Sequence, residues 1–261
     1  MPRPQPTHDY LNQAVDEPVR SVVPRRLLIV LDLNGTLLYR GSSSSPGRPR
    51  PHVESFLQYL FENHDVMVWT SAMPKNAEKM CRNIFTPDQY RKLLTIWTRA
   101  DLRLGELINT AVKGHKRLTW VWHALNGKKQ DRSWWYNQTN TVLIDDSRLK
   151  AAAEPWNLLE VREWDGHDMK DDILDRARDY IDKNLRRTQD VSQYLHKYPP
   201  LFGTHVPVTK AADMKMADPK MADKKTVDSK TADSKTADSL AEDIAMLDLS
   251  KGSVSSGKMD E

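Results

Sequence analysis

Residues 28 to 38 read Leu-Ile-Val-Leu-Asp-Leu-Asn-Gly-Thr-Leu-Leu, and this stretch decides the fold. Its first part is a run of aliphatic residues, which is typical of a strand buried on both faces. The run ends in a carboxylate, Asp32, and the turn-forming pair Asn34-Gly35 and the hydroxyl of Thr36 follow. Open parallel sheets bind their ligands in a crevice at the carboxyl ends of the strands. The stretch therefore predicts an α/β protein with a functional site around Asp32.

Segments with strand and helix patterns alternate along the rest of the chain. Strand-like runs are expected at 26–33, 65–70, 141–144 and 158–164. Apolar residues at helical spacing, or a proline suited to a first turn, predict helices over 53–61, 74–85, 116–125 and 173–185. This alternation predicts a parallel sheet with helices on both faces. The stretch between Thr70 and Lys116 is too short for a large cap domain, so we expect an open crevice that suits a protein-borne substrate.

Composition divides the 261 residues into three parts. Residues 1–24 contain five prolines and no apolar signal core, which predicts a flexible arm. Residues 25–203 hold the expected domain. Residues 204–261 repeat Asp every five residues from 213 to 248, a period of neither helix nor strand, and predict a disordered, solvated tail.

Composition also limits the classes of function. The single cysteine, Cys81, excludes an intramolecular disulfide and argues against a cysteine-based zinc site. No apolar run reaches the roughly 18 residues of a membrane span. A formal charge of +3 could favour an anionic substrate but is too weak to indicate nucleic acid. We expect the nucleus or cytoplasm as the compartment, with the mitochondrion as the alternative.

Polar groups follow the predicted strands at the edge where the functional site is expected. They are Thr70 and Ser71 after the second strand, Lys116 at the start of a helix, and the pair Asp145-Asp146 after the third core strand. Taken singly, each has an ordinary interpretation as a helix cap, a turn former or a surface lysine. Taken together with Asp32, they suit phosphoryl transfer, in which a carboxylate attacks phosphorus, acidic groups hold Mg²⁺ and a lysine neutralises phosphoryl oxygens.

The chain resembles the phosphatase domain of the carboxy-terminal-domain phosphatases of RNA polymerase II, the NLI-interacting-factor-like family of the haloacid dehalogenase superfamily. The resemblance covers about residues 26 to 190. It is carried by Leu-Asp-Leu-Asn-Gly-Thr-Leu-Leu, Val-Trp-Thr-Ser-Ala, Lys-Arg-Leu-Thr-Trp-Val-Trp and Val-Leu-Ile-Asp-Asp-Ser. Glu-Pro-Trp-Asn-Leu-Leu-Glu-Val at 154–161 and Asp171-Asp172-x-Leu174 are also similar to the family.

The resemblance implies a role for each site residue. Asp32 is the nucleophile and a Mg²⁺ ligand, and position 34 gives the metal its backbone carbonyl. Thr70 and Lys116 hold the phosphoryl group, and Thr36 and Ser71 are further candidates for binding substrate. Asp145 and Asp146 complete the shell of the metal and the lysine, and either one could touch the metal directly.

Asn34 departs from the family pattern, which has a second aspartate as general acid and base at this position. Asparagine keeps the backbone carbonyl but cannot transfer the proton, an assistance worth roughly 10² to 10⁴ in rate. Two hypotheses for the function follow. One is a slow, Mg²⁺-dependent phosphoserine or phosphothreonine protein phosphatase. The other is an inactive phosphatase-fold scaffold that binds a protein partner, similar to the phosphatase-like subunit of the mitochondrial presequence translocase.

Two segments outside these motifs could bind partners. Residues 126–140 combine basic and aromatic residues, which could grip a phosphopeptide or nucleic acid, or else pack Trp134 and Trp135 on the core. In the tail, four aliphatic residues predict a short helix after Ser239 that could fold back onto the core, dock on a partner or act as a nuclear export signal. These four residues are Leu240, Ile244, Leu247 and Leu249.

Overall fold

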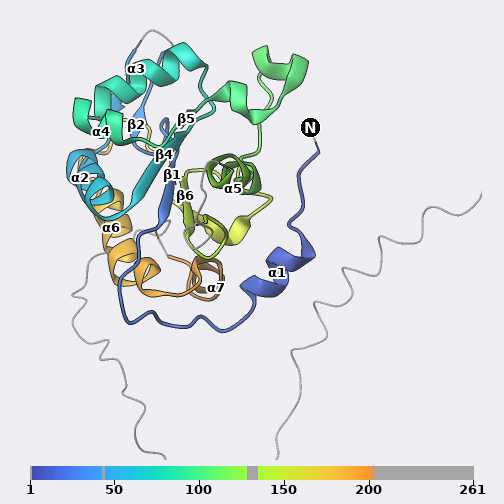
Figure 1. Ribbon diagram of the computed structural model, residues 1–261. Coiled ribbons are helices and arrows are strands. Elements are labelled where there is room, and N and C mark those ends of the chain that lie inside the picture. The colour runs from blue at the N-terminus through green and yellow to red at the C-terminus, as the bar shows by residue number, and fades with distance from the viewer. Residues whose placement is uncertain (1, 43–44, 128–134, 201, 203–261) are drawn as a thin grey trace, which may run out of the picture. The chain divides into compact units, whose positions relative to one another are not determined.

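Five parallel strands form the central sheet of the protein (Figure 1). The computed structural model describes residues 2–42, 45–127, 135–200 and 202. The sheet order is β5-β4-β1-β6-β7. The strands are β1 (Leu28–Leu31), β4 (Asp65–Trp69), β5 (Ile96–Trp97), β6 (Thr141–Asp145) and β7 (Leu158–Glu160). The parallel α/β architecture predicted from the sequence is confirmed.

Helices cover both faces of the sheet because successive side chains of its strands point to opposite sides. Ile29 and Leu31 belong to one buried cluster, with residues of α2 (Val53–Asn63), α3 (Pro74–Ile84) and α6 (Ile173–Lys183). Leu28 and Val30 belong to the other cluster, with residues of α5 (Leu118–Asn126). Figure 1 shows α2 and α6 on one side of β1 and α5 on the other. Every residue of β1 is therefore buried, as its uninterrupted apolar run predicts.

The segment between β4 and α5 contains short elements rather than a cap domain. Residues 71–115, which are described throughout, form α3, α4 (Pro87–Lys92), the two-residue strand β5, and the 3₁₀ turns η1 (Arg99–Leu102) and η2 (Gly105–Asn109). A capping box starts α4, in which Thr86 and Gln89 each bond the backbone of the other. This stretch therefore contains no cap domain, in agreement with the expectation.

Three differences between the predicted and the observed elements concern the region of the site. Helix α5 begins at Leu118, so Lys116 lies in the extended segment before the helix. Strand β7 ends at Glu160 rather than at 164, and residues 161–172 form a connection in which Trp164 donates its backbone N–H to Gly35 at 2.8 Å. A small antiparallel ladder, β2 (Leu38–Tyr39) with β3 (Arg48–Pro49), follows the turn after β1.

The first 24 residues differ from the flexible arm that their prolines predict. Helix α1 (His8–Ala14) has Thr7 as its N-cap and buries Tyr10 and Ala14. The Tyr10 hydroxyl donates to Asn157 Oδ1 at 3.0 Å, in the 3₁₀ turn η4 (Pro155–Asn157). Helix α1 also packs against α7 (Val191–Lys197). These tertiary contacts stabilise a helix too short to form alone, so a sequence pattern of two apolar residues gave little sign of it.

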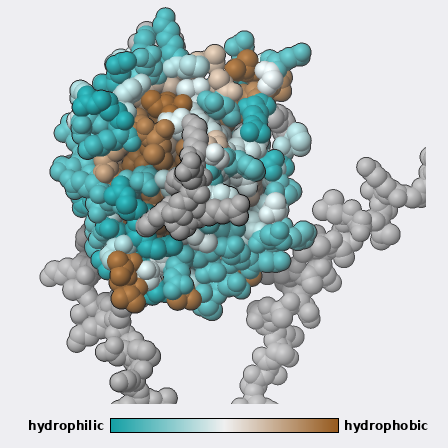
Figure 2. All heavy atoms as spheres, viewed as in Figure 1, coloured by the Kyte–Doolittle hydropathy of each residue, from teal (hydrophilic) through white to brown (hydrophobic). Residues whose placement is uncertain are grey.

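The connection from α1 to β1 carries exposed apolar side chains. Val15, Val19, Val22 and Val23 are exposed. Figure 2 shows small hydrophobic patches along the lower edge of this face, where this connection runs in Figure 1, and a larger hydrophobic patch in its upper half.

Two predictions fall on residues outside the described ranges. They are the tail with its apolar motif and residues 128–134 of the 126–140 segment, including Trp134. Trp135 is described and is 38% exposed, which does not fit burial in the core. None of the helices in the described ranges is both long and apolar enough to cross a membrane.

Candidate active site

The site lies at the carboxyl end of the sheet, where the strand order changes direction along the chain. The chain passes from β1 outward to β4 and β5, and then returns to place β6 on the other side of β1. Leu31 is in register with both Val68 and Ile144, so Asp32 is level with Trp69 and Asp145. Such a switch point is where open α/β sheets bind ligands.

Asp32 and Asp145 face a common lysine. The Lys116 Nζ lies 3.0 Å from Asp32 Oδ1 and 2.5 Å from Asp145 Oδ2, and all three side chains are almost completely buried. The hydrogen bond of the ammonium goes to Asp145, whereas Asp32 Oδ1 accepts no hydrogen bond from the described residues. Asp32 Oδ1 is therefore a buried carboxylate oxygen next to a positive charge.

A second lysine, Lys150, completes the cluster, and the sequence motifs did not predict it. Its Nζ lies 2.8 Å from Asp32 Oδ2, 2.9 Å from Asp145 Oδ1 and 2.9 Å from Asp146 Oδ1. All four oxygens of Asp32 and Asp145 thus lie within 3.0 Å of an ammonium. Three carboxylates and two ammoniums leave one net negative charge when all five are ionised.

Burial and these charges act in opposite directions on the pKa values. Burial raises the pKa of Asp32, but the ammoniums of Lys116 and Lys150 outweigh it and lower the pKa to about 2. Burial raises the pKa of Asp145 to about 7, with Lys116 opposing the rise and the charge of Asp32 adding to it. Burial lowers the pKa of Lys150, but the three carboxylates, Asp32 foremost, hold it above its ordinary value. Asp32 is therefore ionised, and Lys150 protonated, at neutral pH.

The carboxylates form a donor set suited to a divalent cation. One oxygen from each of Asp32, Asp145 and Asp146 can be chosen so that all three lie within 4.8 Å of one another. Carboxylate oxygens are the ligands that Mg²⁺ uses in proteins. The residue types therefore fit the metal that the family resemblance implies. The ammonium of Lys150, however, contacts the same three carboxylates.

The turn after Asp32 brings the backbone close to Asp146. Gly35 has φ +85°, and a Cβ there would lie 3.0 Å from Asp146 Oδ2 and 3.2 Å from Glu163 Cγ. Glycine is favoured here because its φ is positive and because a side chain would crowd Asp146. The preceding residue, Asn34, is exposed, and its Oδ1 accepts the backbone N–H of Arg40 at 2.7 Å. Its side chain thus bonds to the backbone of its own loop.

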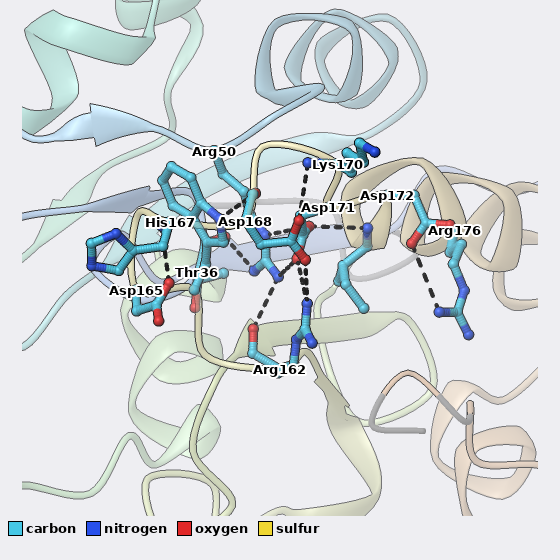
Figure 3. Close-up of polar contacts among 12 residues, drawn as sticks. Thr36, Arg50, Arg162, Asp165, His167, Asp168, Lys170, Asp171, Asp172 and Arg176 are labelled. Carbon is cyan, nitrogen blue, oxygen red and sulfur yellow. Dashed lines mark hydrogen bonds and ion pairs between the residues drawn. The ribbon is translucent and has the colours of Figure 1, made fainter. Parts of the chain in front are cut away.

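Thr36 is joined to a buried ion pair on the far side of this turn (Figure 3). Its carbonyl accepts from Arg50 Nη1 at 3.0 Å, and its fully buried hydroxyl has no partner among the described residues. Arg50 also binds both carboxylate oxygens of Asp171, each at 2.8 Å, and donates to the Arg162 carbonyl. Arg50 thereby fixes the 34–36 turn against the 162–171 connection, and this contact explains Asp171 in the family-like pattern.

Thr70 and Ser71 follow β4 beside Asp32, as predicted. Thr70 is buried, and its Oγ1 accepts the backbone N–H of Ala72 at 3.3 Å, which leaves its own proton for another acceptor. Ser71 is half-buried. The structure thus brings Asp32, Lys116, Asp145 and Asp146 into one cluster, while binding by Thr36, Thr70 and Ser71 stays a prediction.

Comparisons with known proteins agree with this site. Residues 27–192 match the family of NLI interacting factor-like phosphatases. An uncharacterized FCP1 homology domain-containing protein of Schizosaccharomyces pombe is 33% identical over 75% of this chain and 85% of its own length. The ubiquitin-like domain-containing CTD phosphatase 1 of Xenopus tropicalis is 25% identical over 66% of this chain and 53% of its own.

One solved structure to which the chain aligns is that of a CTD phosphatase. The structure of Fcp1, an essential RNA polymerase II CTD phosphatase, aligns with a TM-score of 0.36 and 14% identity over 61% of this chain and 51% of that chain. The chain spans about half the length of the CTD phosphatases it matches, such as the Xenopus protein. The family match covers more than half of this chain and includes Asp32, Lys116, Asp145 and Asp146. The chain therefore belongs to the NLI interacting factor-like phosphatase family.

Proposed function

We propose that the chain is a slow phosphoserine or phosphothreonine protein phosphatase that forms a phosphoryl intermediate on Asp32. The observation that carries this proposal is the ionised Asp32, whose Oδ1 lies 3.0 Å from Lys116 Nζ at the end of β1. A carboxylate in this position is a nucleophile held beside the charge that neutralises its target. Residues 71–115 form no cap domain over the strand ends, which suits a phosphorylated side chain carried by a protein.

The proposed reaction has two displacements at phosphorus. In the first, Asp32 Oδ1 forms a bond to phosphorus, and the bond from phosphorus to the serine or threonine oxygen breaks. The leaving oxygen takes a proton from water. In the second, a water oxygen attacks phosphorus and loses a proton to solvent, the Asp32–phosphorus bond breaks, and phosphate leaves. Lys116 stays beside the phosphoryl oxygens, and the free hydroxyl proton of Thr70 is a further donor.

Asn34 makes both displacements slow. An aspartate at this position would give the leaving oxygen its proton and later take one from water. The amide of Asn34 does neither, so protonation depends on solvent. Leaving groups that are stable as anions should therefore be released faster than alkoxides.

Mg²⁺ would be held by Asp32, Asp145 and Asp146, with the backbone carbonyl of Asn34 as a further ligand implied by the family. A bound Mg²⁺ supplies positive charge to the phosphoryl oxygens. With the metal bound, Asp32 would still attack phosphorus and Lys116 would still neutralise charge on the phosphoryl oxygens.

A second function is favoured by two observations. Asn34 removes the proton-transfer group, and Lys150 occupies the carboxylate cluster. Both would leave phosphate binding intact while slowing turnover. The alternative is therefore a scaffold that binds a phosphorylated protein partner without hydrolysing it.

Beryllium fluoride, a phosphoryl mimic, should bind wild type in the presence of Mg²⁺ and should not bind Asp32→Asn. The reason is that the mimic needs a carboxylate oxygen at the position of Asp32 Oδ1. Isothermal titration calorimetry on the full chain measures this. Asp16→Asn, which removes an exposed carboxylate outside the site, should bind like wild type. Equal binding by Asp32→Asn and wild type, or none by wild type, would contradict the proposal.

A further inference from the structure

The ammonium of Lys150 lies where a divalent cation would contact the three site carboxylates. Its Nζ is 2.8 to 2.9 Å from one oxygen of each of Asp32, Asp145 and Asp146. These distances are those of charge-assisted hydrogen bonds. An ammonium has three N–H groups, so the three carboxylates match its whole donor capacity.

The backbone of the turn after β6 fixes Lys150 in this place. The Lys150 carbonyl accepts the backbone N–H of Lys116 at 2.7 Å, and its own N–H donates to Ser147 at 3.1 Å. The neighbouring Leu149 carbonyl lies 2.7 Å from His115 Nδ1. The two lysines of the site are therefore joined through their backbones, and the Lys150 side chain is only 17% exposed. These contacts distinguish Lys150 from a surface lysine that reaches a carboxylate by chance.

Charge and space prevent the ammonium and a divalent cation from sharing these oxygens. Mg²⁺ requires oxygen ligands at 2.0–2.1 Å in octahedral geometry. A metal so close to the same three carboxylates would lie within a few ångströms of Nζ and repel it. Adding two positive charges to a cluster with one net negative charge would also leave it net positive. One cation must therefore leave when the other binds.

We propose that Lys150 is an intramolecular counter-cation that substitutes for the divalent metal in this site, so that Mg²⁺ binds only when the Lys150 side chain moves out. The inference goes beyond the proposed function and rests on the Mg²⁺ site that is part of it, but it does not depend on hydrolysis. The Lys150 ammonium lowers the affinity of the site for metal. When no metal is bound, it balances the negative charges of Asp32 and Asp145. The remaining solvent contact of Lys150 gives its side chain a direction in which to leave.

Removing the ammonium should create a tighter metal site. We expect Lys150→Met to bind Mn²⁺, a spectroscopic substitute for Mg²⁺, at least about 10-fold more tightly than wild type, a difference of about 1.4 kcal/mol. Electron paramagnetic resonance of free Mn²⁺ measures this on the full chain without any turnover. Lys113→Met is the matched control, since it removes the same charge from an exposed position three residues before Lys116. It should bind Mn²⁺ like wild type.

A second measurement uses wild type alone, because Lys150→Met leaves three carboxylates less compensated and could lose its fold. Reaction of lysines with an amine-acetylating reagent, read by mass spectrometry, should modify Lys150 faster at saturating Mn²⁺ than without metal. Lys113 should react equally in both conditions. Unchanged reactivity of Lys150 at saturation, or equal Mn²⁺ affinity of wild type and Lys150→Met, would overturn the inference. Neither result depends on hydrolysis, so a phosphatase that proves inactive leaves this test intact.

Discussion

Asn34→Asp is expected to raise the rate of phosphate ester hydrolysis by about 10² or more, the usual scale of general acid–base assistance. The substitution adds the proton-transfer group that the site lacks. It is compatible with the turn, because a carboxylate can accept the backbone N–H of Arg40 as the amide oxygen of Asn34 now does. Steady-state kinetics with a phosphoserine peptide measures the effect.

The gain should depend on the leaving group. An aryl phosphate releases a stable anion and needs less protonation, so Asn34→Asp should accelerate it less than a phosphoserine peptide. The double variant Asp32→Asn with Asn34→Asp is the control and should be inactive on both. Equal rates of wild type and Asn34→Asp on the peptide would show that another feature of the site limits turnover. Mass spectrometry should accompany the assay, because deamidation at Asn34-Gly35 would create an aspartate in wild type.

Arg50→Met is expected to lower the free energy of unfolding by about 3 to 5 kcal/mol, the range found when one partner of a buried ion pair is removed. The variant removes the bidentate partner of the fully buried Asp171 side chain and leaves it the ion pair with Arg162 Nη2 at 3.2 Å. It also frees the Thr36 carbonyl and so loosens the turn that carries Asn34 and Gly35. Urea unfolding followed by tryptophan fluorescence measures the change.

Arg48→Met is the matched control for this prediction. Arg48 is an exposed arginine of β3. Among the described residues its side chain has one hydrogen bond, to the Gly166 carbonyl at 2.9 Å, so its loss should cost about 1 kcal/mol or less. Similar losses for the two variants would contradict the role given to Arg50.

The Arg50 effect should also depend on pH. Burial raises the pKa of Asp171, but its hydrogen bonds and charge contact with Arg50 bring it below the ordinary value. A group with a lowered pKa in the folded state stabilises the protein above its unfolded pKa and loses this effect as the pH falls. The difference between wild type and Arg50→Met should therefore be largest near neutral pH and decrease in acid.

Much of the fold followed from local sequence patterns. The apolar run before Asp32 predicted β1, and the spacing of Phe56, Leu57 and Leu60 predicted α2. The polar residues at the ends of β1 and β6 predicted the carboxylate cluster, because parallel strands place their carboxyl ends at one edge. These features depend on the spacing of apolar residues and on the alternation of strands and helices, and both can be recognised in the sequence.

The rest depends on contacts between distant segments. Helix α1 and the two-residue strand β5 have too few apolar residues for a pattern, and their tertiary contacts fix them. Lys150 belongs to none of the sequence motifs, and its place among three carboxylates comes from the turn that ties its backbone to Lys116. Arg50 stands in a segment rich in Pro and Arg, and its partner Asp171 is 121 residues away. Arg50 has a basic side chain that is fully buried, which no local pattern indicates.

The most direct test of the central claim is to look for a phosphoryl group on Asp32. Wild type should be mixed with an aryl phosphate, quenched in acid within one turnover, digested, and analysed by mass spectrometry. Because Asn34 cannot activate the second water, we expect the intermediate to accumulate on the peptide that contains Asp32 and to disappear after hydroxylamine, which cleaves acyl phosphates. Phosphate release without a modified Asp32, or a phosphoryl group on another residue, would contradict the account.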